Sequence, residues 1–322
     1  MGPFMVQNQR FALVDQMTSG LIDGDLAGIM GLAFQSIAST QAVPFWQALV
    51  NNNEWSQPIM SFQIARFVDD PQATEDEPGG VLTFGGTNSS LFTGNIDFQN
   101  FPSGTQASFW LQTVTSVSVG GKSVSIPSGN GALAAIDTGT TLIGGPTDAV
   151  NNIWGAVSGA SPMTGQDQGF WAFPCNTKVN VTFSFGGNSW PISPSDMNLG
   201  SVGGGMCRGA IFDVSQGSNI PANGGTPSWI VGGTFLKNVY TVFRASPPSV
   251  GFAQLSNAAG GSPGSPGSPT GSSRVTQTGN PLPSVSGSGA FSVHYGSGSV
   301  ATAVVLSVLV SLLSSTLIFS HA

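Results

Sequence analysis

The feature that most constrains the fold is a recurring pattern of short apolar alternations, each broken by glycine, asparagine or proline, which runs to about residue 255. Residues 114–119 alternate in this way before Gly120 and Gly121, and residues 178–185 do so before two further glycines. Such alternation is typical of half-buried β-strands that end in turns. Helical periodicity is confined to residues 43–51 and 146–157, each of which has a proline near its start. Because no βαβ series is visible, the pattern predicts a mainly β protein and argues against a doubly wound parallel sheet.

The charge of the chain limits its partners. Charged residues make up only 7% of the sequence, against roughly 25% in an average soluble domain. The net charge is −7 with eight lysines and arginines, which leaves no basic stripe to neutralise phosphates. We therefore expect no nucleic-acid partner. Since few groups would change charge on acidification, we expect the fold to tolerate low pH.

Two cysteines and two glycosylation sequons point to an oxidising compartment. Cys175 and Cys207 are either buried thiols or one disulfide, and the disulfide is favoured because it would close a loop rich in glycine, proline and asparagine. Loop-entropy arithmetic for that spacing gives a stabilisation of roughly 3 to 4 kcal/mol. Asn88 and Asn180 each begin an Asn-X-Ser/Thr triplet and are candidate N-glycosylation sites. Disulfides and such glycans are both typical of secreted proteins.

The composition changes after residue 256. Residues 257–299 are rich in Gly, Ser and Pro and cannot bury a core, which predicts a disordered stalk. Residues 300–322 form an uncharged apolar tail, long enough to cross a bilayer but followed by no lysine or arginine. Small residues at 287–290 precede the tail, as in a GPI-attachment signal, which we favour over a transmembrane anchor. We expect an extracellular protein held at the cell surface by this tail.

The N-terminus does not fit such a location, because residues 1–10 form neither the charged nor the apolar region of a signal peptide. We expect the native start to lie upstream of Met1.

The position of the histidines excludes several reaction classes. His294 and His321 both fall in the predicted stalk and tail, so the remainder of the chain contains no imidazole. Ser-His-Asp and Cys-His catalysis and histidine-based zinc sites are therefore excluded. We expect no metal and no cofactor, and acid–base chemistry would have to come from carboxylates.

Asp137 is the carboxylate in the most suggestive setting. It follows the apolar run 134–136 and precedes Thr138, Gly139, Thr140 and Thr141. A backbone N–H near Gly139 and the Thr140 hydroxyl can both donate hydrogen bonds to the carboxylate and hold it in place. The same residues also suit an ordinary Asx turn after a strand, and the triplet alone does not decide between a catalytic and a purely structural aspartate.

The wider sequence resembles one family. Residues 136–142, I-D-T-G-T-T-L, resemble the second active-site motif of the pepsin-like aspartic peptidases. Residues 23–34, 82–86 and 229–243 resemble, in the family's order, the F-D-G-I-L-G-L-A segment, a strand near the lobe boundary and the W-I-L-G-D-x-F segment near the enzyme's end.

The resemblance implies a bilobal acid-protease fold, mainly β, with an incomplete first lobe. Residues 1–102 would be the remnant of the N-terminal lobe and residues 103–256 the C-terminal lobe. Asp137 would be catalytic, and the substrate-binding loop would comprise Thr138, Gly139, Thr140 and Thr141. Ile230, Val231 and Gly232 would form the strand that supports this loop, and Cys175 and Cys207 would form the second-lobe disulfide.

The same resemblance exposes a gap. Residues 29–31, Ile-Met-Gly, would be the equivalent supporting strand of a first-lobe loop, but the chain holds no second Asp-Thr/Ser-Gly. Peptide hydrolysis in this family uses a water between one ionised and one protonated carboxyl, so we expect the chain alone to be inactive. Gly233 also departs from the aspartate frequent in the family, which bears on the working pH.

Two other interpretations are considered. A catalytically inactive homologue, displayed on the stalk, would bind peptides or cell-wall material. A phosphoryl-transfer aspartate would need a lysine where Thr138 stands and a phosphate-binding loop, and the sequence has neither. The leading interpretation remains an aspartic endopeptidase acting as a monomer on peptides or proteins.

Overall fold

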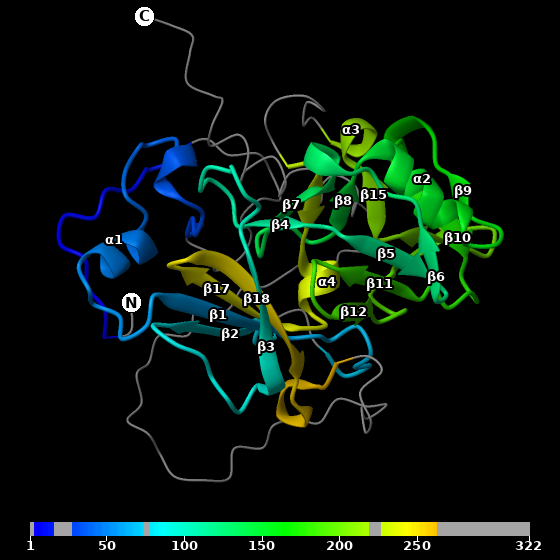
Figure 1. The fold of residues 1–322 in the computed structure, drawn as a ribbon. Coiled ribbons are helices and arrows are strands. Elements are labelled where there is room, and N and C mark those ends of the chain that lie inside the picture. Colours follow the sequence, from blue (N-terminus) through cyan, green and yellow to red (C-terminus); the bar gives the residue numbers. More distant parts are fainter. Residues whose placement is uncertain (1–2, 16–27, 74–76, 219–226, 263–322) are drawn as a thin grey trace, which may run out of the picture.

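The computed structural model describes residues 3–15, 28–73, 77–218 and 227–262. The predicted stalk and tail, apart from residues 257–262, lie outside the described residues, as do both histidines. The described chain is built mainly from β-strands in four sheets, as the alternation pattern predicted (Figure 1).

The central sheet joins segments from both ends of the described chain. Strand β1 (Ile59–Ile64) pairs with β17 (Tyr240–Ala245), although about 180 residues separate them. The full order is β2 (Gly80–Phe84), β1, β17, β18 (Pro248–Leu255) and β3 (Phe92–Asn100), all antiparallel. Strands from before and after residue 102 therefore share one sheet, which lies between α1 and the remaining sheets in Figure 1.

A second sheet of five strands contains the parallel pairs. Its order is β15 (Ile211–Asp213), β8 (Ile143–Gly145), β16 (Trp229–Val231), β7 (Leu133–Ile136) and β4 (Leu111–Thr113). Strand β16 runs parallel to β7 and antiparallel to β8, and so lies between two strands that one short loop connects. This arrangement sets the position of Asp137.

The other two sheets have four strands each and are antiparallel. One has the order β12 (Ser189–Ile192), β11 (Val181–Ser184), β5 (Ser116–Val119) and β6 (Lys122–Val124). The other has the order β13 (Asn198–Gly203), β14 (Met206–Gly209), β10 (Trp171–Pro174) and β9 (Ser161–Pro162). The predicted disulfide is confirmed: Cys175, next to β10, is bonded to Cys207 on β14.

The two predicted α-helices are present but begin after their prolines. They are α1 (Phe45–Asn51) and α2 (Thr147–Gly155), preceded by Pro44 and Pro146 in an extended conformation with ψ near 150°. Two one-turn helices, α3 (Val214–Gly217) and α4 (Gly233–Leu236), and four 3-10 turns were not predicted from periodicity, because four residues or fewer carry too little of it. The 3-10 turns are Gln35–Ile37, Gly129–Ala132, Gly165–Asp167 and Asn257–Ala259.

The core is rich in aromatic side chains. Phe34, Trp46 and Trp110 are buried with ring centroids 4.6 to 5.3 Å apart, which ties the segment before residue 102 to the segment that leads into β4. Helix α2 buries Trp154, whose indole N–H donates to the Ile211 carbonyl at 2.8 Å. Burial of such rings stabilises the fold by contact area and by edge-to-face geometry.

Candidate active site

Asp137 stands at the end of strand β7, in the loop that leads to β8. Its backbone N–H donates to the Val231 carbonyl of β16 at 3.0 Å, which continues the parallel pairing of β16 with β7. The loop therefore starts from a strand that is paired on both sides and has little freedom to move. Asp137 itself is half-buried at the point where the core strands end.

Both carboxylate oxygens of Asp137 accept hydrogen bonds from its own loop. The Gly139 N–H donates to Oδ1 at 2.9 Å, and the Thr140 hydroxyl donates to Oδ2 at 2.6 Å. Both bonds were predicted from the sequence. The first is the bond of an Asx turn, but the second fixes the other oxygen as well and comes from a side chain that is only 2% exposed. The carboxylate is thus held in one orientation with part of its surface open to solvent.

Residues 230–233 pack against the loop and hold it through backbone hydrogen bonds. The Gly232 N–H donates to Leu142 O at 3.0 Å, and the Gly233 N–H donates to Thr140 O at 2.7 Å. A Cβ at position 232 would lie 2.1 Å from Thr140 O, so the backbone approach seen here requires glycine. Ile230 and Val231 are buried in β16, which places the predicted supporting strand against the loop.

The remaining loop residues lie around Asp137 as a set. Thr138 and Thr141 are half-buried, and Gly139 is exposed. Thr141 is held through its carbonyl, which accepts a bond from the Thr234 N–H at 2.8 Å. All four predicted loop residues lie in the one loop between β7 and β8. Their contacts with a substrate stay a prediction.

The second supporting strand predicted from the sequence does not form. Residues 29–31 adopt no strand, and Ile29 is 58% exposed. In the described chain no loop equivalent to residues 137–142 lies beside them, so their backbone lacks the two flanking strands that β16 has. Residues 16–27, which include the first part of that family-like segment, lie outside the described residues.

The other sequence candidates lie away from the loop. Asn180 is exposed, whereas Asn88 is half-buried and its Oδ1 accepts bonds from the Ser90 N–H and hydroxyl at 3.1 and 2.7 Å. Among the described residues there is no group of three His, Cys, Asp or Glu side chains suited to a metal, and no helix long and apolar enough to cross a membrane.

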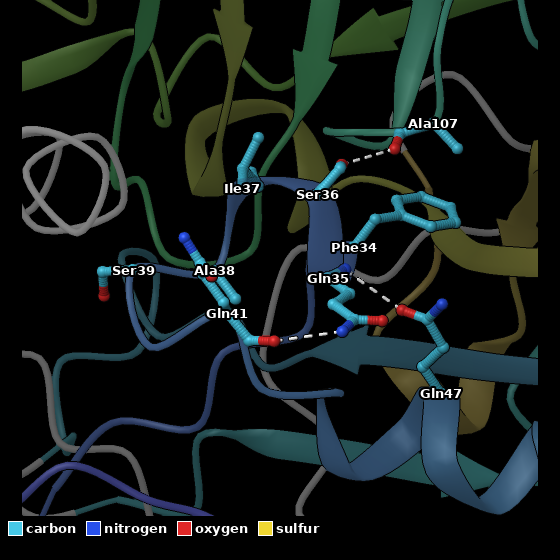
Figure 2. Close-up of a pocket in the computed structure, with 9 residues that line it drawn as sticks. All are labelled: Phe34, Gln35, Ser36, Ile37, Ala38, Ser39, Gln41, Gln47 and Ala107. Carbon is cyan, nitrogen blue, oxygen red and sulfur yellow. Dashed lines mark hydrogen bonds between the residues drawn. The ribbon is translucent and has the colours of Figure 1, made fainter.

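One cavity of the described residues does not include Asp137 in its lining. Its volume is about 690 Å³, and it is lined by nine residues at the Gln35–Ile37 turn, where Ser36 donates to Ala107 O and the Gln35 N–H to Gln47 (Figure 2). The lining contains amides, a hydroxyl pair and apolar groups but no acid or base. Its residues are therefore suited to contact a ligand or another chain segment but not to hydrolyse a bond.

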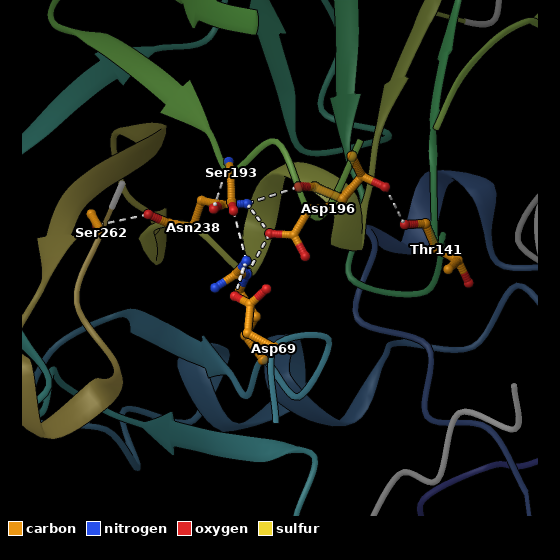
Figure 3. Close-up of polar contacts among 8 residues, drawn as sticks. Asp69, Thr141, Ser193, Asp196, Asn238 and Ser262 are labelled. Carbon is orange, nitrogen blue, oxygen red and sulfur yellow. Dashed lines mark hydrogen bonds and ion pairs between the residues drawn. The ribbon is translucent and has the colours of Figure 1, made fainter. Parts of the chain in front are cut away.

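Sequence reasoning missed a buried polar cluster next to the loop, which we call the Asp196 cluster. It comprises Arg66, Ser193, Asp196 and Asn238 (Figure 3). Burial raises the pKa of Asp196, while the charges of Arg66 and Lys237 act in the opposite direction. Few residues of the chain are charged, so the presence of Asp196 and Asn238 near apolar strands was the only sequence feature that indicated this cluster.

Comparison with known proteins places these features in a family. The family model described as "Eukaryotic aspartyl protease" matches residues 1–255. The chain is 39% identical over 274 residues to Major aspartyl peptidase 1 of Cryptococcus neoformans var. grubii, which covers 82% of this chain and 55% of that relative. It is 33% identical to Aspartic protease of Phaffia rhodozyma (77% of this chain, 56% of the relative) and 34% identical to Pepsin A of Rhinolophus ferrumequinum (77% and 59%). The chain thus spans little more than half the length of these relatives.

Proposed function

This chain belongs to the eukaryotic aspartyl protease family, and from that premise we propose that Asp137 is one of the two catalytic carboxylates of an aspartic endopeptidase. The observation that carries the proposal is the double anchoring of Asp137, whose two oxygens accept bonds from Gly139 and Thr140 while its surface stays partly open. A carboxylate held this way is oriented before substrate arrives, which lowers the reorganisation needed in the transition state.

In the proposed reaction a water molecule lies between Asp137 and a second carboxyl group. The ionised carboxylate takes a proton from the water as its oxygen bonds to the peptide carbon, and the protonated carboxyl gives its proton to the carbonyl oxygen. The C–N bond then breaks as the leaving nitrogen takes the proton that came from the water. One hydroxyl of the intermediate returns its proton to the other carboxylate, which restores one ionised and one protonated carboxyl group. Two carboxyls a few ångströms apart suit this task because like charges so close do not both ionise readily.

The second carboxylate is not provided by another Asp-Thr/Ser-Gly of this sequence, since Asp137 begins the only one. We propose that the chain of 322 residues does not hydrolyse peptides by itself, and that hydrolysis requires a first-lobe loop of the kind that residues 29–31 would support. Thr138, Gly139 and Thr141 are proposed to contact the peptide backbone around the cleaved bond, since they lie beside Asp137.

The proposed setting is the cell surface, with proteins or peptides as substrates and a monomer as the acting form. The Cys175–Cys207 disulfide, the exposed sequon at Asn180 and the low charge density support an extracellular location. The lobe division at residue 102, the stalk and a GPI or membrane anchor remain part of this proposal.

The test compares three preparations at acidic and neutral pH. These are the 322-residue chain, the same chain extended by the sequence encoded upstream of it, and the extended chain with Asp137→Asn. Cleavage of a protein substrate by the extended chain alone, inhibited by pepstatin and lost in Asp137→Asn, is the expected result. Asp148→Asn is the control, because Asp148 is an exposed acid on the first turn of α2. Cleavage that survives Asp137→Asn would refute the proposal.

The inactive-homologue interpretation rests on the single Asp-Thr-Gly. If the extended chain also lacks a second aspartate loop and binds peptides without cleaving them, that interpretation replaces the enzymatic one.

A further inference from the structure

The Asp196 cluster connects three distant parts of the chain beneath the candidate active site. Arg66 follows strand β1 of the central sheet, Ser193 and Asp196 lie in the turn between β12 and β13, and Asn238 lies between α4 and β17 (Figure 3). Asp196 is 5% and Asn238 1% exposed. Buried polar groups of this kind persist only where their hydrogen bonds are satisfied, so the contacts of each indicate what the cluster does.

Asn238 uses its whole side-chain amide within the fold. Its Nδ2 group donates to Asp196 Oδ2 and to the Thr234 carbonyl, both at 2.9 Å, and its Oδ1 accepts from the Ser193 N–H at 3.1 Å. Its backbone carbonyl accepts from the buried hydroxyl of Ser262 at 2.7 Å. Four hydrogen bonds therefore hold Asn238 in place, and one of them also holds the Thr234 carbonyl of α4.

Asp196 is the centre of the cluster. Its Oδ2 accepts from Arg66 Nε at 2.7 Å as well as from Asn238, while its Oδ1 has no hydrogen-bond partner among the described residues. Arg66 also donates to the Ser193 hydroxyl at 2.6 Å and pairs with Asp69 at 2.5 Å. One oxygen atom thus joins the central sheet to Asn238.

The cluster reaches the Asp137 loop through α4. Thr234, whose carbonyl Asn238 holds, donates its N–H to Thr141 O at 2.8 Å and its hydroxyl to the same oxygen at 3.3 Å. The preceding N–H, that of Gly233, donates to Thr140 O at 2.7 Å. Thr140 then holds Asp137 Oδ2 through its hydroxyl. The path from Asp196 to the candidate catalytic carboxylate therefore consists of hydrogen bonds and of one peptide link, that between Gly233 and Thr234.

We propose that Asp196 is a positioning residue for the Asp137 loop, which it orients by locking Asn238 and α4 against the loop and by tying them through Arg66 to the central sheet. The inference rests on the proposed function, because the orientation of the loop affects catalysis only if Asp137 is a catalytic carboxylate. It adds a residue that lies 59 positions beyond Asp137 in the chain.

The test reads the loop directly and does not require proteolysis. Amide hydrogen exchange is measured at Gly233 and Thr234, and the resonance of the Gly139 amide proton reports its bond to Asp137 Oδ1. In Asp196→Ala we expect exchange at Gly233 and Thr234 to rise about tenfold, equivalent to about 1.4 kcal/mol, and the Gly139 resonance to move. Asp196→Asn, which keeps an acceptor oxygen for Arg66 and Asn238, should restore both readouts to within about threefold of wild type.

Two further variants are measured: one controls for the loss of any ion pair, and the other is a second change within the cluster. Asp167→Ala breaks the pair with Arg208, which has the same 2.7 Å separation but does not touch the loop, and should leave exchange at Gly233 and Thr234 unchanged. Asn238→Ala removes the bond to the Thr234 carbonyl and leaves Asp196 paired with Arg66. It is the second variant should Asp196→Ala not fold, and it should show the same local rise.

The inference is overturned if folded Asp196→Ala or Asn238→Ala raises exchange at Gly233 and Thr234 no more than Asp167→Ala does, or if it raises exchange equally throughout β11 and β12. Loss of cleavage in Asp137→Asn with an unmoved loop in Asp196→Ala would overturn this inference alone. Cleavage independent of Asp137 with a displaced loop in Asp196→Ala would overturn the proposed function alone.

Discussion

Gly232→Ala is the substitution whose effect the geometry determines most directly. An added Cβ would lie 2.1 Å from Thr140 O and 2.6 Å from Leu142 O, and both contacts are with backbone atoms that have no rotamer to escape to. The loop would have to withdraw by about an ångström, because real Cβ–oxygen contacts begin above 3 Å. The two carbonyls concerned accept the bonds from Gly233 and Gly232, so withdrawal weakens both.

The expected loss of stability combines two effects. Overpacking in a closely packed site costs about 1 to 3 kcal/mol, and two weakened backbone hydrogen bonds add about 1 kcal/mol each. Gly232→Ala should therefore lower the free energy of unfolding by about 3 to 5 kcal/mol, which for a domain of this size corresponds to a fall in Tm of about 6 to 20 °C.

Thermal and denaturant unfolding measure this effect, with Gly155→Ala as the matched control. Gly155 ends α2 and a Cβ there meets nothing within 4 Å, so its replacement should change stability by less than about 0.5 kcal/mol or raise it slightly. If the two variants unfold within about 0.5 kcal/mol of each other, close backbone approach does not hold the loop.

Three further outcomes are expected. Replacing Cys175 and Cys207 together by alanine should lower the free energy of unfolding by about 3 to 4 kcal/mol in denaturant titrations, since 32 positions separate them, and a change below 1 kcal/mol would contradict this. The pKa of Asp196 is raised from 3.8, so the native state binds its proton more tightly; the stability this contributes is fully present below pH 3.8 and is lost as pH rises through the higher folded pKa. Asp196→Asn should remove that part of the pH dependence of unfolding, which an unchanged stability–pH curve would disprove. Asn180→Gln should lower the apparent mass of protein secreted from a eukaryotic host, because Asn180 is exposed, and identical mobility would exclude a glycan there.

Local patterns predicted much of the fold because they act over a few residues. The alternations before Gly120 and Gly186 became β5 and β11, and two prolines marked the starts of α1 and α2 to within a turn. The bonds to Asp137 were equally predictable, because donor and acceptor lie within three residues. In each case the chain needs no distant partner to reach the observed conformation.

The Asp196 cluster could not be predicted in this way. Arg66 and Asp196 are 130 residues apart, and Asp196 sits in a Ser-Pro-Ser-Asp stretch that looks like an exposed turn. Its burial follows from the central sheet, in which β1 pairs with β17 and brings Arg66 beneath α4. No local pattern signals that pairing, so the sequence does not distinguish a buried aspartate here from one in a solvent-exposed turn.

The contrast between residues 29–31 and 230–232 shows how far one motif can specify structure. Both segments read as two apolar residues followed by glycine, yet only the second forms a strand. Val231 is buried and its carbonyl accepts the Asp137 N–H, because β7 and β8 flank it, whereas Ile29 is 58% exposed. The three-residue pattern is therefore compatible with a central strand but does not by itself form one. The strand forms where the two strands on either side of an aspartate loop pair with it, as β7 and β8 do with β16. By this reasoning, adding a first-lobe Asp-Thr-Gly loop to the chain should bury Ile29, and hydrogen exchange at residues 29–31 would slow to the rate of β16 if it does.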